Sequence, residues 1–201
     1  MTRVPEHVVL ASGNAGKLRE FRALFDGAGM KVDPQSVFDI TDAEESGLSF
    51  VENAILKARH ASSLSGLPAI ADDSGLEVDA LNGAPGVFSA RFAGPGASDA
   101  DNIAKLLEQM VEVGDDARSA RFQCLLVYMR HPEDPTPMIC QGTWEGVIAH
   151  KPQGRHGFGY DPVFFVREQN CTAAELTREV KNTLSHRARA LHQLLDRLRH
   201  H

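Results

Sequence analysis

A short apolar run, a glycine-containing turn and an amphipathic helix follow one another near the N-terminus. Val8-Val9-Leu10-Ala11 has the length of a buried strand, and the polar turn Ser12-Gly13-Asn14-Ala15-Gly16-Lys17 comes directly after it. Apolar residues then recur at helical spacing: Leu18, Phe21, Leu24 and Phe25. We expect this helix to end at Gly27 or Gly29. A strand that passes at once into a helix indicates an α/β fold.

A second strand and helix are predicted between residues 49 and 75. Residues 49–52 (Ser-Phe-Val-Glu) match a capping box, and the helix that follows should end near Gly66. The apolar run Leu67-Pro68-Ala69-Ile70-Ala71 reads as a short buried strand. Asp72 and Asp73 come next, and Ser74-Gly75 is interpreted as a turn.

The second half of the chain is richer in strands. Residues 122–129 and 137–149 are strand-like, and the proline-containing stretch 131–135 between them predicts a hairpin-type connection. Residues 162–166 form another apolar run. The mixed order predicts an α/β architecture with antiparallel pairing in this half.

Composition limits the class of protein. The 201 residues fit one domain, or one domain with two lobes, and 42% hydrophobic with 24% charged residues is ordinary for a globular protein. The formal net charge of −6 argues against a general nucleic-acid binder. The N-terminus carries no apolar stretch of signal or membrane length. Cys124, Cys140 and Cys171 show no metal-type spacing, so reduced, buried thiols in a cytoplasmic protein are expected.

The turn at residues 12–17 is a candidate phosphate site. Backbone N–H groups at a helix N-terminus favour phosphate, and Lys17 adds a positive charge. A plain polar turn is the alternative. A Walker A loop is excluded, because Leu18 stands where a magnesium-binding Ser or Thr is needed, and no G-x-G-x-x-G dinucleotide motif is present.

Four acidic residues lie next to predicted element ends: Glu44, Glu45, Asp72 and Asp73. Mg²⁺ is typically held by one or two carboxylates together with substrate phosphates and water, so one acid from each pair would suffice. A carboxylate beside the metal could also accept a proton from the attacking water. The alternative is a solvated acidic loop.

Two further segments are candidates for binding a base. Phe158 stands between Gly157 and Gly159 and could offer its ring for stacking, although it could equally pack inward in a β-turn. The stretch Ser185-His186-Arg187 predicts a helix start with a basic first turn, against the usual preference of the helix dipole, which donors aimed at a ligand would explain. Alternatively, that helix begins near Thr172.

These segments resemble the inosine triphosphate pyrophosphatase family, whose members hydrolyse deaminated purine nucleotides. The matches follow the order of the family and span nearly the whole chain. They are Ser12-Gly13-Asn14-Ala15-Gly16-Lys17, Glu52-Asn53-Ala54, Ala71-Asp72-Asp73-Ser74-Gly75-Leu76, Pro85-Gly86-Val87-Phe88-Ser89-Ala90-Arg91, Gly157-Phe158-Gly159-Tyr160-Asp161-Pro162 and Ser185-His186-Arg187.

The resemblance implies a reaction and a set of residues. A purine nucleoside triphosphate such as ITP, dITP or XTP would be cleaved to the monophosphate and pyrophosphate with Mg²⁺. Glu44 and Asp73 would hold the metal, and Asp73 would accept the proton of the attacking water. The triphosphate would contact residues 12–17 and Ser74. The nucleotide and base would contact the remaining residues: Phe158, Gly159, Tyr160, Asp161, Lys181, His186 and Arg187.

The resemblance also implies an architecture. Residues 1–201 would form one nucleotide pyrophosphatase domain with two lobes, an elongated α/β fold around a long mixed β-sheet flanked by helices. A homodimer is implied, with no nucleic-acid or membrane partner.

Two other functions stay open on the sequence. One is the related Maf-type pyrophosphatase, which acts on other nucleotides and matches residues 157–161 and 185–187 less well. The other is a binding module that senses a triphosphate without cleaving it.

Overall fold

The computed structural model describes residues 5–25 and 29–200. In these residues, seven strands form one sheet in the order β2-β1-β3-β4-β5-β6-β7. The strands are β1 (His7–Ala11), β2 (Lys31–Pro34), β3 (Ala69–Val78), β4 (Ser119–Met129), β5 (Met138–Ile148), β6 (Phe164–Val166) and β7 (Cys171–Thr172). β1 pairs in parallel with β2 and β3, whereas β6 pairs antiparallel with β5 and β7. The predicted α/β fold with a mixed sheet is confirmed.

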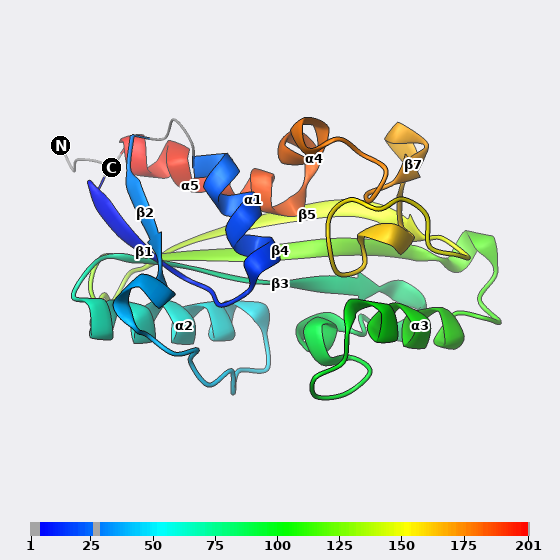
Figure 1. Ribbon diagram of the computed structural model, residues 1–201, viewed down its shortest axis with the longest axis horizontal. Helices are drawn as coiled ribbons and strands as arrows, with labels where there is room; N and C mark the ends of the chain where they lie inside the picture. The colour runs from blue at the N-terminus through cyan, green and yellow to red at the C-terminus, as the bar shows by residue number, and fades with distance from the viewer. Residues whose placement is uncertain (1–4, 26–28, 201) are drawn as a thin grey trace. The chain divides into compact units, whose positions relative to one another are not determined.

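Five α-helices lie within the described residues (Figure 1): α1 (Ala15–Phe25), α2 (Phe50–Ser65), α3 (Asp99–Gln109), α4 (Arg178–Leu184) and α5 (His186–His200). α2 begins as predicted, because the Ser49 hydroxyl accepts a hydrogen bond from the Glu52 backbone N–H. It ends at Gly66, which takes the left-handed conformation (φ 69°) that favours glycine. α1 ends at Phe25, Gly27 lies outside the described residues, and Gly29 is not part of the helix.

The described chain gathers into two compact units. The first comprises residues up to Asp73, Cys124–Gly142 and the chain from His186 onward, and the second comprises Ser74–Gln123 and Thr143–Ser185. The strands β3, β4 and β5 each contribute residues to both units.

In the first unit, helices cover both faces of the sheet (Figure 1). Side chains alternate between the faces of a strand, so neighbouring residues enter different cores. Val8, Leu10 and Ile70 pack with residues of α1 and α5, while Val9 and Ala69 pack with the alanines of α2. This alternation decides where every polar side chain of β1 and β3 lies in this unit.

The core of the second unit is built on aromatic rings. The ring centroids of Phe122 and Phe164 are 4.5 Å apart, and those of Trp144 and Phe164 are 5.3 Å apart. Leu106 and Met110, from α3 and its C-terminal end, are fully buried in the same cluster. Offset and tilted ring pairs of this kind add to the free energy of hydrophobic burial.

Two sequence-based interpretations of local structure are wrong. Ser74-Gly75 is not a turn, because β3 continues through it to Val78 and buries Leu76 and Val78 completely. Thr172 does not begin a helix either: it ends β7, and α4 begins after Thr177, whose hydroxyl accepts a hydrogen bond from the Val180 backbone N–H. β2 was not predicted, and its alternating residues carry a weak apolar pattern.

Other expectations are confirmed or refined. α5 begins at His186, directly after Ser185, so the first turn of this helix is basic as predicted. The three cysteines are free thiols, of which Cys124 and Cys140 are buried and Cys171 is half-buried. Within residues 5–25 and 29–200, no helix has the length and apolar character needed to cross a membrane.

Candidate active site

Asp72 and Asp73 are consecutive residues of β3, and their carboxylates lie on opposite faces of the sheet. Asp72 follows Ile70 on the face covered by α1 and α5, and Asp73 follows Ala71 on the face covered by α2. The sequence suggested that the two acids lie together at a turn, but in the structure both lie within one strand and point to opposite faces. Each has its own lysine partner.

The Asp72 carboxylate is the centre of a buried charge cluster. Its Oδ2 lies 2.7 Å from the Lys17 ammonium and 3.7 Å from the Arg187 Nε, and its Oδ1 accepts a hydrogen bond from the Cys124 thiol at 3.0 Å. Burial alone would raise the pKa of Asp72, but Lys17, Arg187 and Lys57 together hold it well below its ordinary value. Asp72 is therefore a permanent anion that fixes the two cations.

Arg187 lies deep in this cluster, 5% exposed. Its Nη1 donates to the Glu20 carboxylate at 2.8 Å, which links α5 to α1. Burial opposes its charge, but Glu20 and Asp72 outweigh that effect and raise its pKa. The sequence assigned Arg187 to the base, and the structure surrounds its guanidinium with carboxylates of the first unit.

Asp73 has a different environment. Its Oδ1 accepts a hydrogen bond from the Lys57 ammonium at 2.7 Å, and the same ammonium donates to Glu45 at 2.9 Å. Burial raises the pKa of Asp73 above its ordinary value despite the lysines nearby. The Asp73 side chain stays 9% exposed, whereas that of Asp72 is 0% exposed. Of the two, Asp73 is the carboxylate that a ligand from solvent can reach.

Glu45 is the acid of the loop that shares an ammonium with Asp73. Lys57 joins the Glu45 and Asp73 carboxylates, while the Glu44 side chain is exposed. The metal role of Glu44 stays a prediction. Lys57 itself was missed from the sequence. The signal was a lysine one helical turn after Ala54 and one turn before Ala61 in α2, next to the alanines that face the sheet.

The turn at residues 12–17 is shaped by its own side chains. The Ser12 hydroxyl accepts a hydrogen bond from the Asn14 backbone N–H at 3.2 Å, and the Asn14 side-chain oxygen accepts one from the Lys17 backbone N–H at 3.0 Å. Gly13 lies against the Asp42 carboxylate, because a Cβ there would come within 2.8 Å of both of its oxygens. Gly13, Asn14 and Ala15 are exposed, and Gly16 is buried at the start of α1. The exposed N-terminus of α1 can therefore meet a phosphate.

No group of three or more His, Cys, Asp or Glu side chains gathers in metal-binding geometry among the described residues. The pair Glu45 and Asp73 nevertheless fits the donor set of Mg²⁺, which takes one or two carboxylates and completes its shell with water and phosphate oxygens. Both carboxylates meet at a single ammonium, which a divalent cation would have to displace or share.

The second unit holds the aromatic candidate. Asp161 accepts hydrogen bonds from the Phe158 backbone N–H at 2.9 Å and from the Lys181 ammonium. The same ammonium lies 5.4 Å from the centroid of the Phe158 ring. Gly157 (φ 78°) makes this packing possible, since a Cβ there would come within 1.9 Å of the Asp161 carboxylate.

The remaining predicted residues occupy defined places. The Tyr160 hydroxyl donates to the Ser89 carbonyl oxygen at 2.8 Å, and the Gly159 backbone N–H donates to Asp99 at 2.7 Å. Both bonds lie within the second unit, as does Ser74, which is half-buried in β3. His186 is 2% exposed at the start of α5 in the first unit.

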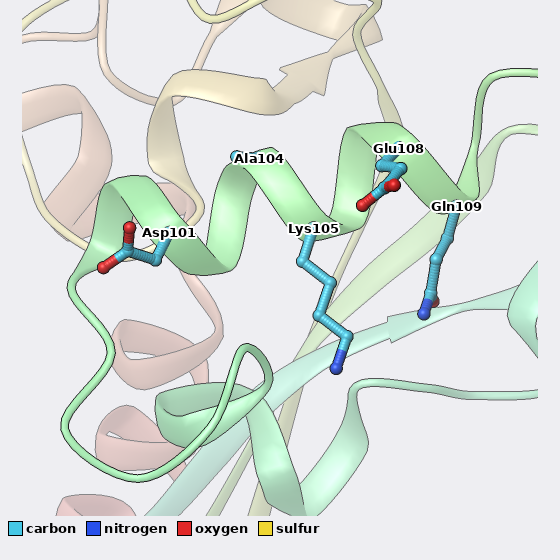
Figure 2. Close-up of a pocket in the computed structure, with 5 residues that line it drawn as sticks. All are labelled: Asp101, Ala104, Lys105, Glu108 and Gln109. Carbon is cyan, nitrogen blue, oxygen red and sulfur yellow. The ribbon is translucent and has the colours of Figure 1, made fainter.

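A surface depression of 610 Å³ runs along α3 in the second unit (Figure 2). Its lining residues are Asp101, Ala104, Lys105, Glu108 and Gln109. Lys105 and Gln109 leave α3 on the same side in this view, and the Lys105 ammonium already donates to the Phe92 carbonyl oxygen at 2.6 Å. None of the sequence-predicted site residues lines this depression, so it does not identify the active site.

Comparisons with known proteins identify relatives of this chain. Residues 8–197 match the Ham1 family. The chain is 59% identical to the dITP/XTP pyrophosphatase of Shigella flexneri over 96% of its own length and 98% of that protein, and 58% identical, with the same coverage, to the dITP/XTP pyrophosphatase of Escherichia coli strain K12. The fold is similar to that of a HAM1 protein from Coxiella burnetii, with a TM-score of 0.90, 51% identity, and 97% and 99% of the two chains covered. The match spans both units and all the segments that carry the site, and the chain therefore belongs to the Ham1 family.

Proposed function

We propose that this chain hydrolyses the triphosphates of deaminated purine nucleosides, ITP, dITP and XTP, to the monophosphate and pyrophosphate. Its relatives are dITP/XTP pyrophosphatases, and we assign the chain to the same class, the nucleoside triphosphate pyrophosphatases. The observation that carries the proposal is the pair of oppositely directed carboxylates on β3. Asp72 is held by Lys17, beside the N-terminal turn of α1, and Asp73 is held by Lys57, beside the acidic loop.

Asp73 is the proposed proton acceptor. A water molecule attacks the α-phosphorus, its proton passes to a carboxylate oxygen of Asp73, and the bond between the α-phosphorus and the bridging oxygen breaks to release pyrophosphate. The raised pKa of Asp73 makes it a better proton acceptor than an ordinary aspartate. Opposite pKa shifts in two neighbouring carboxylates are typical of a pair with separate roles.

Lys17 and the turn before it are proposed to bind the phosphates. The turn offers backbone N–H groups at the start of α1, and Lys17 adds a cation that Asp72 holds in position. Because Asp72 is fully buried, it acts on the substrate through Lys17 rather than by direct contact.

Asp73 and the acidic loop are proposed to hold Mg²⁺, the loop through the predicted ligand Glu44 and through Glu45, which shares Lys57 with Asp73. When bound, the metal supplies positive charge to the phosphate oxygens and lowers the pKa of a coordinated water. Lys57 adds a second cation between the Glu45 and Asp73 carboxylates and keeps them together.

Base selection is proposed to use Phe158 and Lys181, with His186 and Arg187 as the further predicted contacts. The Phe158 ring offers a stacking face, and Lys181 offers N–H donors. Inosine and xanthine carry a 6-oxo acceptor, whereas adenine carries a 6-amino donor. A site of buried donors rejects adenine because its donors would be left without acceptors.

The proposal is tested by incubating the protein with ITP, dITP, XTP, ATP or GTP and Mg²⁺, and by measuring pyrophosphate and orthophosphate separately. Pyrophosphate from the deaminated substrates is expected. Orthophosphate without pyrophosphate would refute the cleavage position, and tight ITP binding without turnover would favour the sensing module. Turnover confined to other nucleotides would favour Maf-type specificity.

A variant tests the assignment of the base contacts. Lys181→Met keeps much of the side-chain volume but removes the donors, and we expect the ITP-to-ATP ratio of kcat/KM to fall by about tenfold or more. An unchanged ratio would show that other residues read the base. We extend the proposal to a homodimer in the cytoplasm, which light scattering of the purified protein and cell fractionation would check.

A further inference from the structure

The segment Glu52-Asn53-Ala54 matched the family in sequence, yet the proposed reaction uses none of these three residues. The structure shows what they contact. The Asn53 side-chain oxygen accepts a hydrogen bond from the Gly47 backbone N–H at 2.8 Å, and Glu52 accepts one from the Leu48 backbone N–H at 3.0 Å. Ala54 is fully buried against the sheet. Two of the three residues therefore hold the loop that precedes the helix.

Further contacts extend this attachment along α2. The His60 Nε2 lies 2.9 Å from the Thr41 carbonyl oxygen, and the Lys57 ammonium lies 2.9 Å from the Glu45 carboxylate. Asn53, Lys57 and His60 are spaced by four and three residues, so they lie on one face of the helix. Residues 41–48 thus run antiparallel alongside α2, and this course is visible in Figure 1.

The far side of this loop reaches the N-terminal turn. Gln35, which is 5% exposed, donates from its side-chain nitrogen to the Asp42 carboxylate, and that carboxylate packs against Gly13. The acidic loop is consequently held between α2 and the turn that precedes α1. Its position is set by hydrogen bonds from side chains, because residues 41–48 form neither helix nor strand.

We propose that Asn53, together with Lys57 and His60 on the same face of α2, is a positioning residue that holds the acidic loop so that the Glu45 carboxylate meets Asp73. This inference rests on the proposed function for its catalytic consequence, but not for the loop contacts themselves. Asn53 is 1% exposed, so its amide cannot bind substrate directly and acts through the loop. A loop free to move would separate the two carboxylates, and a metal ion would then be held by one of them.

Gly47 is the residue of the loop that contacts Asn53. A Cβ at Gly47 would come within 2.6 Å of the Glu52 Cβ and 2.7 Å of the Asn53 side-chain oxygen. Its φ lies outside the left-handed region, so an alanine there meets a steric obstacle without backbone strain. Gly47→Ala therefore pushes the loop away from α2 and leaves the helix sequence unchanged.

Two variants and two controls test the proposal. Asn53→Ala removes the acceptor from the helix side, and Gly47→Ala obstructs the contact from the loop side. Ser62→Ala is the control on the same helix, because the Ser62 hydroxyl is equally buried and donates to the Leu67 carbonyl oxygen, beyond the other end of α2. Gly114→Ala is the glycine control, since a Cβ there meets nothing within 4 Å.

The first measurement is hydrogen–deuterium exchange of residues 41–48 in the protein without nucleotide or metal. We expect both test variants to exchange about tenfold faster than the unmodified protein, from the loss of at least one buried hydrogen bond, and both controls to match it. If the exchange of this segment in Asn53→Ala and Gly47→Ala equals that in the controls, the proposal is wrong.

The second measurement is the Mg²⁺ concentration that gives half-maximal pyrophosphate release. This concentration should rise by about tenfold in the two test variants, because the metal ion would then be held by one carboxylate instead of two. It should stay unchanged in the controls. A loosened loop with an unchanged Mg²⁺ requirement would make Asn53 merely structural and overturn the positioning role. If the unmodified protein releases no pyrophosphate, the proposed function fails, while the exchange experiment still decides whether α2 holds the loop.

Discussion

The carboxylates of Asp72 and Asp73 leave consecutive residues of one strand and meet different lysines on opposite faces of the sheet, Lys17 at 2.7 Å and Lys57 at 2.7 Å. The same strand thus presents a fully buried anion to α1 and α5 and a partly exposed one to α2. Burial acts to raise the pKa of both acids; at Asp72 the Lys17 and Arg187 cations outweigh it and lower the pKa, whereas at Asp73 burial prevails and raises the pKa. The separation also gives the two acids different predicted consequences on substitution.

Asp73→Asn should remove turnover while leaving the fold intact. The asparagine cannot accept the proton of the attacking water, so we expect kcat to fall by roughly 10²-fold or more. Because burial already disfavours the charged form of Asp73, losing that charge should change the free energy of unfolding little. Pyrophosphate release and urea denaturation measure the two quantities, and near-normal turnover would refute the role.

Asp72→Asn should act first on stability. It leaves the buried Lys17 and Arg187 cations without the carboxylate that holds their charge, and breaking a buried ion pair costs about 3–5 kcal/mol of unfolding free energy. Urea denaturation at neutral pH gives the comparison with Asp73→Asn. Equal loss of stability in the two variants would contradict the distinction drawn between the two faces.

Asp134 should contribute to acid unfolding. It is 1% exposed in the turn between β4 and β5, and it accepts hydrogen bonds from the Arg130 guanidinium and from the Arg130 and Thr136 backbone N–H groups. The Arg130 hydrogen bonds hold the pKa of Asp134 well below its ordinary value of 3.8. A lowered pKa means that this stabilisation is fully present above pH 3.8 and is lost as the pH falls below it.

Asp134→Asn therefore should cost about 1–3 kcal/mol at pH 7 and make the free energy of unfolding depend less steeply on pH in the acid range. Denaturation at a series of pH values checks both parts. An acid slope identical to that of the unmodified protein would show that Asp134 is not a source of the acid sensitivity.

Gly157→Ala should weaken nucleotide binding. The new methyl group would displace the Asp161 carboxylate, which holds Lys181 and the Phe158 backbone N–H. Gly83→Ala is the matched control, because Gly83 also has a positive φ (86°) but a Cβ there meets nothing within 4 Å. Both variants carry the backbone strain of about 1 kcal/mol or more.

Steady-state kinetics with ITP separates strain from displacement. We expect a KM about tenfold higher for Gly157→Ala and an unchanged KM for Gly83→Ala, since only the first variant moves a side chain proposed to contact the base. A similar KM in both variants would place base recognition away from Asp161 and Lys181.

The order of the amino acids was enough to predict the fold class and much of the local structure. The apolar run before residues 12–17, the Ser49 cap and the basic start of α5 at His186 are local features, and each formed as predicted. Such features depend on contacts within a few residues, which the order of the amino acids already contains. The family could be identified in the same way, because each of its motifs is a short stretch of sequence and the motifs follow one another in a fixed order.

The surroundings of the acids depend on contacts that form only in the folded protein. The sequence suggested one turn at Ser74-Gly75 with two acids side by side, but strand pairing and the burial of Leu76 extend β3 through it and direct Asp72 and Asp73 to opposite faces. The contacts of Lys57 with Glu45 and with Asp73 depend on the loop lying against α2. These contacts join residues 12 and 16 positions apart. The pKa of a buried carboxylate depends on the charges that the fold brings near it, and local sequence patterns do not specify those charges.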